Sequence, residues 1–286
     1  MPLTVQLEQP TNSQKTDKMK IDLNNVEETL LIPLWGRAQL SREHNSLLND
    51  TKALEIIEQI DYDFSKLDRH SFFRRDLWFA IRAKQFDDKI KAYITEHPRA
   101  SIVNIGAGLD TTFYRVDNGT LHWYDLDLPA VIEIRKRLIP ETDRTIYIAK
   151  SLFDQSWYAD VKNTEDGVFL MAAGVLFYFE ESQVRHFFSS LADNLPRCEI
   201  VFDALPKLGV FFSNWSVRKA GMKGVTVKWA LKDANEFTKW DKRITLIDQL
   251  PLFRNIPRDP SWSMGIRRFM DFSDKYRVLN IFHLRA

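Results

Sequence analysis

The chain has 286 residues, enough to bury a large core in one domain, and its 44% hydrophobic and 13% aromatic residues exclude an intrinsically disordered protein. The chain has 40 lysine and arginine residues and 39 aspartate and glutamate residues, which gives a formal net charge of +1. No overall electrostatic field therefore attracts the protein to nucleic acid or to a membrane. The single cysteine, Cys198, excludes an intramolecular disulfide and a paired-cysteine metal site, and neither a signal-peptide core nor a membrane-spanning apolar run is present. We therefore expect a cytoplasmic protein with a small-molecule partner and no metal, whose oligomeric state the sequence leaves open.

The N-terminal third divides into two parts. Residues 1–25 are polar and lack sustained periodicity, which predicts a loose arm. In residues 26–98, apolar residues such as Phe86, Ile90 and Ile94 recur at helical spacing, which predicts a helical N-terminal region. The remaining chain completes a single predicted domain over 26–286.

Strand-like and helix-like segments alternate from residue 99 onward. This pattern predicts a mainly parallel sheet with helices on both faces, and hence an α/β fold. The predicted core, 99–205, has strands at 101–106, 121–127, 145–150, 167–173 and 198–205, with helices at 129–138 and 180–194. A partly helical insertion follows at 206–242, and residues 243–286 are predicted to supply two C-terminal strands, 243–250 and 276–284.

A glycine pair follows the first predicted strand. Gly106 and Gly108, in NIGAGLD, allow the backbone to turn tightly and a ligand to approach without a Cβ in the way. Thr111 stands where the third glycine of the dinucleotide-binding pattern would be. The pair therefore indicates either a nucleotide-binding loop or an ordinary strand-to-helix turn.

Two carboxylates end the second predicted strand about twenty residues later, where a ribose diol would need an acceptor. Asp125 and Asp127 lie two residues apart, so strand alternation places both on the same side. The residues alone leave open which of them binds ribose, and the other is a candidate helix N-cap ahead of Pro129. Asp154, after the third strand, is a candidate either for binding an adenine amino group or for capping the next helix.

Several blocks together resemble the leucine carboxyl methyltransferase superfamily. VNIGAGLDTTFYRV, WYDLDLPAVIEIRK and MAAGVLFYFEE carry the resemblance, with ETLLIPLWGRA, IRAKQFDD and GMKGVTVKWALKDANEFTKW in support. The similarity runs from about residue 28 to the C-terminus and is closest to the bacterial branch of tetracenomycin-type polyketide O-methyltransferases. It implies a seven-stranded, Rossmann-like class I methyltransferase fold that binds S-adenosyl-L-methionine.

The resemblance also implies roles for individual residues. Arg82 would bind the methionine carboxylate, Gly106 would lie in the cofactor loop, Asp127 fits the ribose position better than Asp125, and Leu152 would flank the adenine. A guanidinium suits the first role because it grips a carboxylate bidentately, although a solvated helix face is the alternative; Arg37 is a second anion-binding candidate. Ala173 departs from the family, in which an acidic residue often precedes the GVL motif, so one polar contact is in doubt.

The reaction implied is methyl transfer to a carboxylate or hydroxyl oxygen of a small molecule. A carboxylate, with a pKa near ~4, is already ionised and needs no general base, whereas a phenol, with a pKa near ~10, would be helped by a base or by a strong hydrogen-bond donor. Tyr178 is a candidate for facing the acceptor, or else packs a strand-to-helix junction. The insertion, which contains Trp215, Met222, Trp229 and Trp240, is a candidate acceptor lid or a dimer interface. Alternatives are a protein C-terminal carboxyl methyltransferase, a cofactor-binding protein without catalysis, and a nucleotide-dependent oxidoreductase, which the missing third glycine disfavours.

Overall fold

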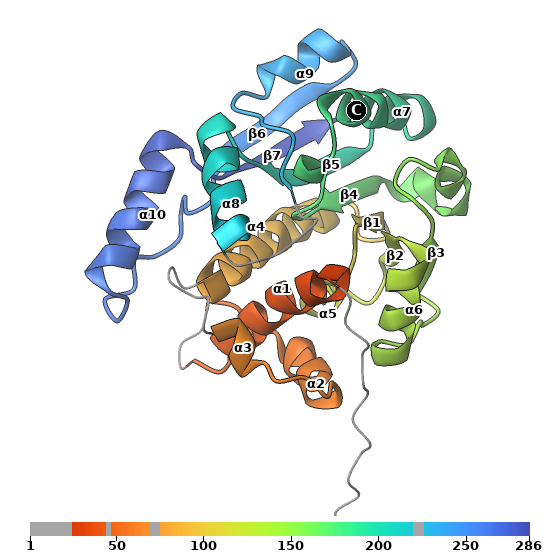
Figure 1. Cartoon of the computed structure of the whole chain (residues 1–286). Coiled ribbons are helices and arrows are strands. Elements are labelled where there is room, and N and C mark those ends of the chain that lie inside the picture. Colours follow the sequence, from red (N-terminus) through yellow and green to blue (C-terminus); the bar gives the residue numbers. More distant parts are fainter. Residues whose placement is uncertain (1–24, 44–46, 69–74, 220–225) are drawn as a thin grey trace, which may run out of the picture.

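A computed structural model describes residues 25–43, 47–68, 75–219 and 226–286 (Figure 1). The predicted arm, 1–25, lies outside this part of the chain except for its last residue. The N-terminal region is helical as predicted, with α1 (Asn25–Ser41), α2 (Thr51–Gln59), α3 (Ser65–Asp68) and α4 (Arg75–Glu96). Asp50 caps α2, because its side chain accepts a hydrogen bond from the backbone N–H of Ala53.

The sheet has seven strands in the order β3-β2-β1-β4-β5-β7-β6. Neighbouring strands among β1 to β5 pair in parallel, whereas β7 runs antiparallel to both β5 and β6. The strands are β1 (Ser101–Ile105), β2 (His122–Asp127), β3 (Thr145–Ala149), β4 (Val168–Ala172), β5 (Glu199–Ala204), β6 (Thr245–Pro251) and β7 (Asn280–Arg285). The α/β fold and the mainly parallel seven-stranded sheet are confirmed.

Helices cover both faces of this sheet (Figure 1). Alternate strand residues enter different cores. Val103 packs in a cluster with α7 (Glu181–Asn194) and α9 (Asn235–Trp240), whereas Ile102 packs in a cluster with α4 and α10 (Met264–Tyr276). A third cluster joins α1 and α2 to Leu109, in the loop after β1, and to α6. The remaining helices are α5 (Phe113–Val116), α6 (Pro129–Leu138) and α8 (Lys207–Lys219), with 3-10 helices η1 (Gln155–Asp160), η2 (Thr164–Asp166) and η3 (Leu176–Tyr178).

The C-terminal segment differs from its prediction. Residues 243–286 contain α10 as well as two strands, and the strand expected from residue 276 begins at Asn280. Ser263 caps α10, since its hydroxyl accepts from the N–H of Ile266, and Arg277 ends it with a left-handed φ of 52°. The helix therefore extends to Tyr276, and the strand begins later in the chain than predicted.

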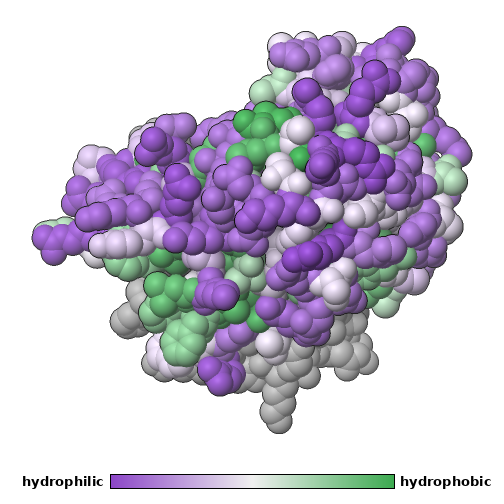
Figure 2. All heavy atoms as spheres, turned by 90° about the horizontal axis from the view of Figure 1, so that it is seen from above, coloured by the Kyte–Doolittle hydropathy of each residue, from purple (hydrophilic) through white to green (hydrophobic). Residues whose placement is uncertain are grey.

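Much of the surface seen from above is hydrophilic, with apolar patches between the polar side chains (Figure 2). Among the described residues, no helix combines the length and the apolar character needed to cross a bilayer.

Candidate functional site

The strand order places a topological switch point between β1 and β4. The connection from β1 leads to β2 on one side, whereas β4 pairs with β1 on the other side. In open α/β sheets, ligands bind outside the carboxyl ends of the strands at such a point. The predicted site residues that follow β1, β2, β3 and β4 all lie at this edge.

The loop after β1 requires glycine for two reasons. Gly106 and Gly108 have φ values of 64° and 47°, in the left-handed region that favours glycine. A Cβ on Gly106 would lie 2.5 Å from Cγ2 of Val175, which follows β4. The backbone of this loop therefore approaches the end of β4 more closely than any side chain would allow.

Asp127, the last residue of β2, lies directly beside this loop. Its Oδ2 accepts from the N–H of Gly108 at 2.8 Å, and its Oδ1 accepts from the N–H of Leu128 at 2.7 Å. Burial raises the pKa of the carboxyl, although both N–H groups oppose that change. A carboxylate has about four acceptor positions, so this half-buried side chain can still accept hydrogen bonds from a ligand.

Asp125 has a structural role, which corrects its place among the candidate ribose ligands. Its side chain is 1% exposed and accepts from Nδ2 of Asn104 and Nε1 of Trp123, both at 2.9 Å. Arg135 grips the same carboxylate through Nη2 at 2.7 Å and Nε at 3.1 Å. These four donors occupy the acceptor positions of Asp125, so Asp127 is the carboxylate left for a ligand.

Arg135 is a residue that sequence reasoning missed. Besides Asp125, its guanidinium binds the carbonyl oxygens of Gly108 at 3.0 Å and Asp110 at 2.8 Å, so it ties α6 and β2 to the glycine loop. A signal was present, because Arg135 falls on the buried stripe of α6 with Val131, Ile132 and Leu138. A charged residue on such a stripe indicates a buried ion pair.

Arg37 is also committed to the protein interior, which corrects its proposed role as a second anion-binding residue. It is buried, its Nε contacts Oδ2 of Asp50 at 2.9 Å, and its Nη2 donates to the carbonyl of Leu109 at 3.0 Å. Asp50 also accepts from Arg115 at 2.8 Å. Burial opposes ionisation of Asp50, but Arg37 and Arg115 outweigh it and lower its pKa. Through the carbonyl of Leu109, this network holds the loop after β1 in place.

Arg82, on α4, reaches the ends of β4 and β5. Its Nη1 lies 3.2 Å from Oδ2 of Asp203, the penultimate residue of β5, and a Cβ on Gly174 would lie 2.6 Å from the same nitrogen. The N–H of Gly174 donates to Oδ1 of Asp203 at 2.6 Å. Ala173 adds only a methyl group, packed against the core that contains α4. Sequence reasoning missed Asp203, because its partner Arg82 lies 121 residues away.

Tyr178 ends η3 near this ion pair. Its ring packs edge-on against Phe177 and is 38% exposed. Partial burial raises the pKa of its hydroxyl, and the charges of Arg82 and Asp203 act on it in opposite directions. A phenol with a raised pKa stays protonated at neutral pH and is therefore a hydrogen-bond donor.

The two candidates after β3 differ in what their side chains do. Leu152 is half-buried against the main core, and its carbonyl accepts from Nε1 of Trp157 at 3.1 Å. Asp154 is exposed and caps η1 by accepting from the N–H of Ser156 at 3.0 Å. The capping alternative for Asp154 is therefore the one that the contacts favour.

The aromatic residues of the insertion have different surroundings. Trp229 is core, packed among Phe202, Phe237 and Trp240, whereas Trp215 on α8 is about half exposed. Met222, a further lid candidate, lies outside the described residues. The insertion therefore offers an exposed apolar surface chiefly on α8.

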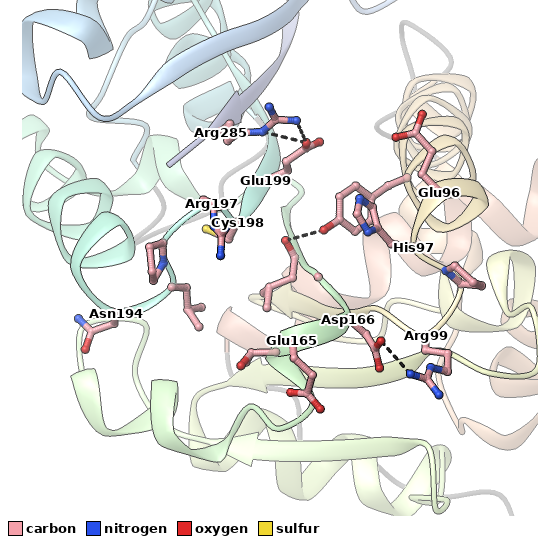
Figure 3. A pocket seen from close by; sticks show the side chains of 17 residues that line it. Glu96, His97, Arg99, Glu165, Asp166, Asn194, Arg197, Cys198, Glu199 and Arg285 are labelled. Carbon is pink, nitrogen blue, oxygen red and sulfur yellow. Dashed lines mark hydrogen bonds and ion pairs between the residues drawn. The ribbon is translucent and has the colours of Figure 1, made fainter.

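A separate pocket of about 750 Å³ lies at the amino ends of the parallel strands, opposite the predicted site (Figure 3). Val168 and Glu199, the first residues of β4 and β5, line it together with Arg285, at the end of the antiparallel β7. Because ligands of such sheets bind at the carboxyl ends of the parallel strands, this pocket is not the cofactor site. Within the described part of the chain, no group of three or more His, Cys, Asp or Glu side chains is arranged to hold a metal ion.

Comparison with known proteins identifies a matching family and two relatives that are methyltransferases. Residues 31–192 match the model of the leucine carboxyl methyltransferase family. The tetracenomycin polyketide synthesis O-methyltransferase of Streptomyces glaucescens is 31% identical over 212 residues, which cover 74% of this chain and 77% of that protein. An S-adenosyl-L-methionine-dependent methyltransferase of Gibberella zeae is 29% identical over 241 residues, 77% of this chain and 80% of that protein.

Solved structures support the fold. A candidate methyltransferase from Thermobifida fusca has a TM-score of 0.56 at 13% identity and covers 80% of this chain and 89% of its own. A DUF574 family protein from Streptomyces avermitilis also has a TM-score of 0.56, at 14% identity, and covers 88% of this chain and 96% of its own. With the glycine loop and Asp127 placed at the switch point, the chain belongs to the leucine carboxyl methyltransferase family and is an S-adenosyl-L-methionine-dependent methyltransferase.

Proposed function

We propose that the cofactor lies across the carboxyl ends of β1, β2 and β4. The residues present fit its parts: Gly106 and Gly108 leave room for close approach, Asp127 has acceptor positions for a ribose diol, and Arg82 carries the charge that a carboxylate needs. When bound, S-adenosyl-L-methionine supplies a methyl group on a positively charged sulfur. The protein has to align the acceptor oxygen with that group and to exclude water.

The adenine end of the cofactor would lie against the loop that follows β3. Leu152 offers a half-buried apolar surface for the ring, which supports the role that the family resemblance gives it. Asp154 would have to reach the adenine amino group with a carboxylate that already caps η1. Ala173 lies beside Gly174 and would contact the cofactor through its methyl group only.

We propose that the acceptor is a small molecule methylated on a carboxylate or hydroxyl oxygen. Tyr178 carries this proposal: the charges of Arg82 and Asp203 act on its hydroxyl, its side chain is partly exposed, and its raised pKa keeps it protonated at neutral pH. A protonated phenol can hold an acceptor oxygen as a hydrogen-bond donor but cannot remove a proton from it. The site therefore favours an acceptor that arrives ionised, such as a carboxylic acid or an acidic phenol.

Helix α8 supports an apolar acceptor with a broad surface, as expected for a polyketide-like molecule. Leu208, Phe211 and Phe212 are 52%, 59% and 52% exposed, and helical spacing places them on one stripe. Val210, elsewhere on the helix, packs against Phe177, the neighbour of Tyr178. The stripe thus belongs to a helix anchored beside the site, and we propose residues 206–242 as the acceptor side of the domain.

A protein C-terminal carboxyl is the second candidate acceptor, because the matching family model is that of leucine carboxyl methyltransferases. A third candidate function is cofactor binding without catalysis, which the replacement of an acidic family residue by Ala173 motivates. A cytoplasmic location is proposed from the single cysteine, Cys198, which is buried as a free thiol.

The test is transfer of a labelled methyl group from S-adenosyl-L-methionine to a panel of aromatic carboxylic acids, acidic phenols and peptides ending in leucine. We expect labelled products from the first two classes, and alkaline treatment separates them because it cleaves methyl esters but not methyl ethers. Asp127→Ala is the control for transfer that depends on the cofactor site. Labelling of peptides alone would favour the second candidate, and cofactor binding without any transfer would favour the third.

A further inference from the structure

A largely buried ion pair lies at the carboxyl ends of β4 and β5. Arg82 comes from α4 and Asp203 from β5, and their side chains are only 18% and 10% exposed. Removing two charges from water costs free energy that their mutual attraction does not always recover. Burial alone therefore assigns the pair no role. Unlike the pairs of Arg37 and Arg135, whose side chains are 6% exposed or less, both members of this pair keep some exposure at the ligand-binding end of the sheet, and that position points to a ligand.

Both members of the pair can bind more than each other. Oδ1 of Asp203 accepts from the N–H of Gly174 at 2.6 Å, and Oδ2 faces Nη1 of Arg82 at 3.2 Å. About two of the four acceptor positions of a carboxylate are then left for a ligand. A guanidinium carries five N–H donors, of which Asp203 takes one.

We propose that Asp203 binds the α-ammonium group of S-adenosyl-L-methionine while Arg82 binds its α-carboxylate. These two ligand charges are attached to the same carbon atom, so their receptors must also be adjacent and of opposite sign. Arg82 and Asp203 meet that requirement, and the N–H of Gly174 fixes the carboxylate between them. The inference rests on the proposed cofactor position and adds a cofactor-binding residue to it.

The neighbouring residues support this assignment. Ala173 ends in a methyl group, so the side chain after β4 offers no charge to an ammonium group. A Cβ on Gly174 would lie 2.6 Å from Nη1 of Arg82, so this glycine keeps open the space in which the guanidinium lies. Asp203 is therefore the carboxylate that the fold holds beside the carboxylate-binding arginine.

Calorimetric titration with cofactor analogues tests the proposal without any acceptor. The ligands are S-adenosylhomocysteine, its analogue without the amino group, and its analogue without the carboxylate. Asp203→Asn should lower the affinity for S-adenosylhomocysteine about 10- to 100-fold, which is the effect of losing one charge-assisted hydrogen bond. Its affinity for the analogue without the amino group should equal that of the wild type. Arg82→Met should show the reverse selectivity, sparing the analogue without the carboxylate.

Glu199→Gln is the matched control, because it removes a carboxylate charge from the opposite end of β5, where Glu199 contacts His283 and Arg285. Its affinities should equal those of the wild type. If Asp203→Asn does not fold, Asp203→Glu tests the same contact, since it keeps the charge but moves it by one methylene group.

Equal weakening of all three ligands by the Asp203 variant would overturn the proposal, because Asp203 would then only hold Arg82 in place. Unchanged affinity for S-adenosylhomocysteine would overturn it as well. In both cases the wild-type protein still binds cofactor, so the proposed function survives. A wild-type protein that binds none of the ligands would instead overturn the proposed cofactor site and this inference together.

Discussion

Replacing Arg135 with leucine should destabilise the protein strongly. The side chain of Arg135 is 2% exposed, and its guanidinium makes four hydrogen bonds, two to Asp125 and one each to the carbonyls of Gly108 and Asp110. Leucine fills much of the same space but leaves a buried carboxylate without its counter-charge.

The size of the effect follows from that geometry. Breaking a buried ion pair from one side costs about 3–5 kcal/mol, and two carbonyls also lose their donor. Because a whole domain is stable by only about 5–15 kcal/mol, the variant should lose a large fraction of its stability. With a shift of roughly 2–4 °C per kcal/mol, the midpoint of thermal unfolding should fall by about 10 °C.

Urea unfolding of the wild type and of Arg135→Leu measures this directly. Arg185→Leu is the control, since Arg185 pairs with Glu181 on the surface of α7 and lies 4.7 Å from the ring centroid of Trp240, and the loss of both contacts should cost about 1 kcal/mol. Adding Asp125→Asn to Arg135→Leu should recover part of the loss, because the unpaired charge is then removed. A cost below about 1 kcal/mol for Arg135→Leu, or no recovery in the double variant, would refute the interpretation of a buried, interdependent pair.

Three further predictions concern the cofactor loop and its supports. Gly106→Ala should cost about 1–3 kcal/mol and abolish measurable cofactor binding in calorimetry, because its φ is left-handed and the new Cβ would collide with Val175; a variant that binds normally would contradict the tight turn. Cofactor affinity should fall as the pH falls through the pKa of Asp127, which burial places above the usual value of about 4. Asp127→Asn should flatten this dependence of affinity on pH. If the affinities of the wild type and of the variant depend on pH equally, Asp127 is not the titrating ligand. Asp50 has a lowered pKa in the folded state, so its contribution to stability is present above about pH 4 and is lost as the pH falls through the folded value. The slope of unfolding free energy against pH below about 4 should therefore be smaller in Asp50→Asn, and an unchanged slope would show that other carboxylates dominate.

The sheet was predictable because its strands are short apolar segments bounded by turn residues, so all seven were expected at or near their observed positions. Local spacing indicated the glycine loop and the pair of Asp125 and Asp127, and the family resemblance favoured Asp127 of the two. Long-range contacts were not predictable, since nothing near Arg82 in the sequence indicates that Asp203 lies beside it. The internal contacts of Asp125 and Arg37 were unpredictable for the same reason, because their ion-pair partners, Arg135 and Asp50, come from other parts of the fold. In the sequence, a polar residue near a site is the same whether it faces a ligand or a buried ion pair.

The last strand has a consequence for how the protein is made. β7 separates β5 from β6 and hydrogen-bonds along both, and the backbone of Ala286 pairs with Arg197 and Cys198 ahead of β5. During synthesis, β5 leaves the ribosome long before β7, so the edge of the sheet at β5 has unpaired backbone groups until β7 is made. Removing the residues from Asn280 onward would leave that edge permanently open and detach β6, and the truncated protein should aggregate even though every cofactor-site residue named above is still present.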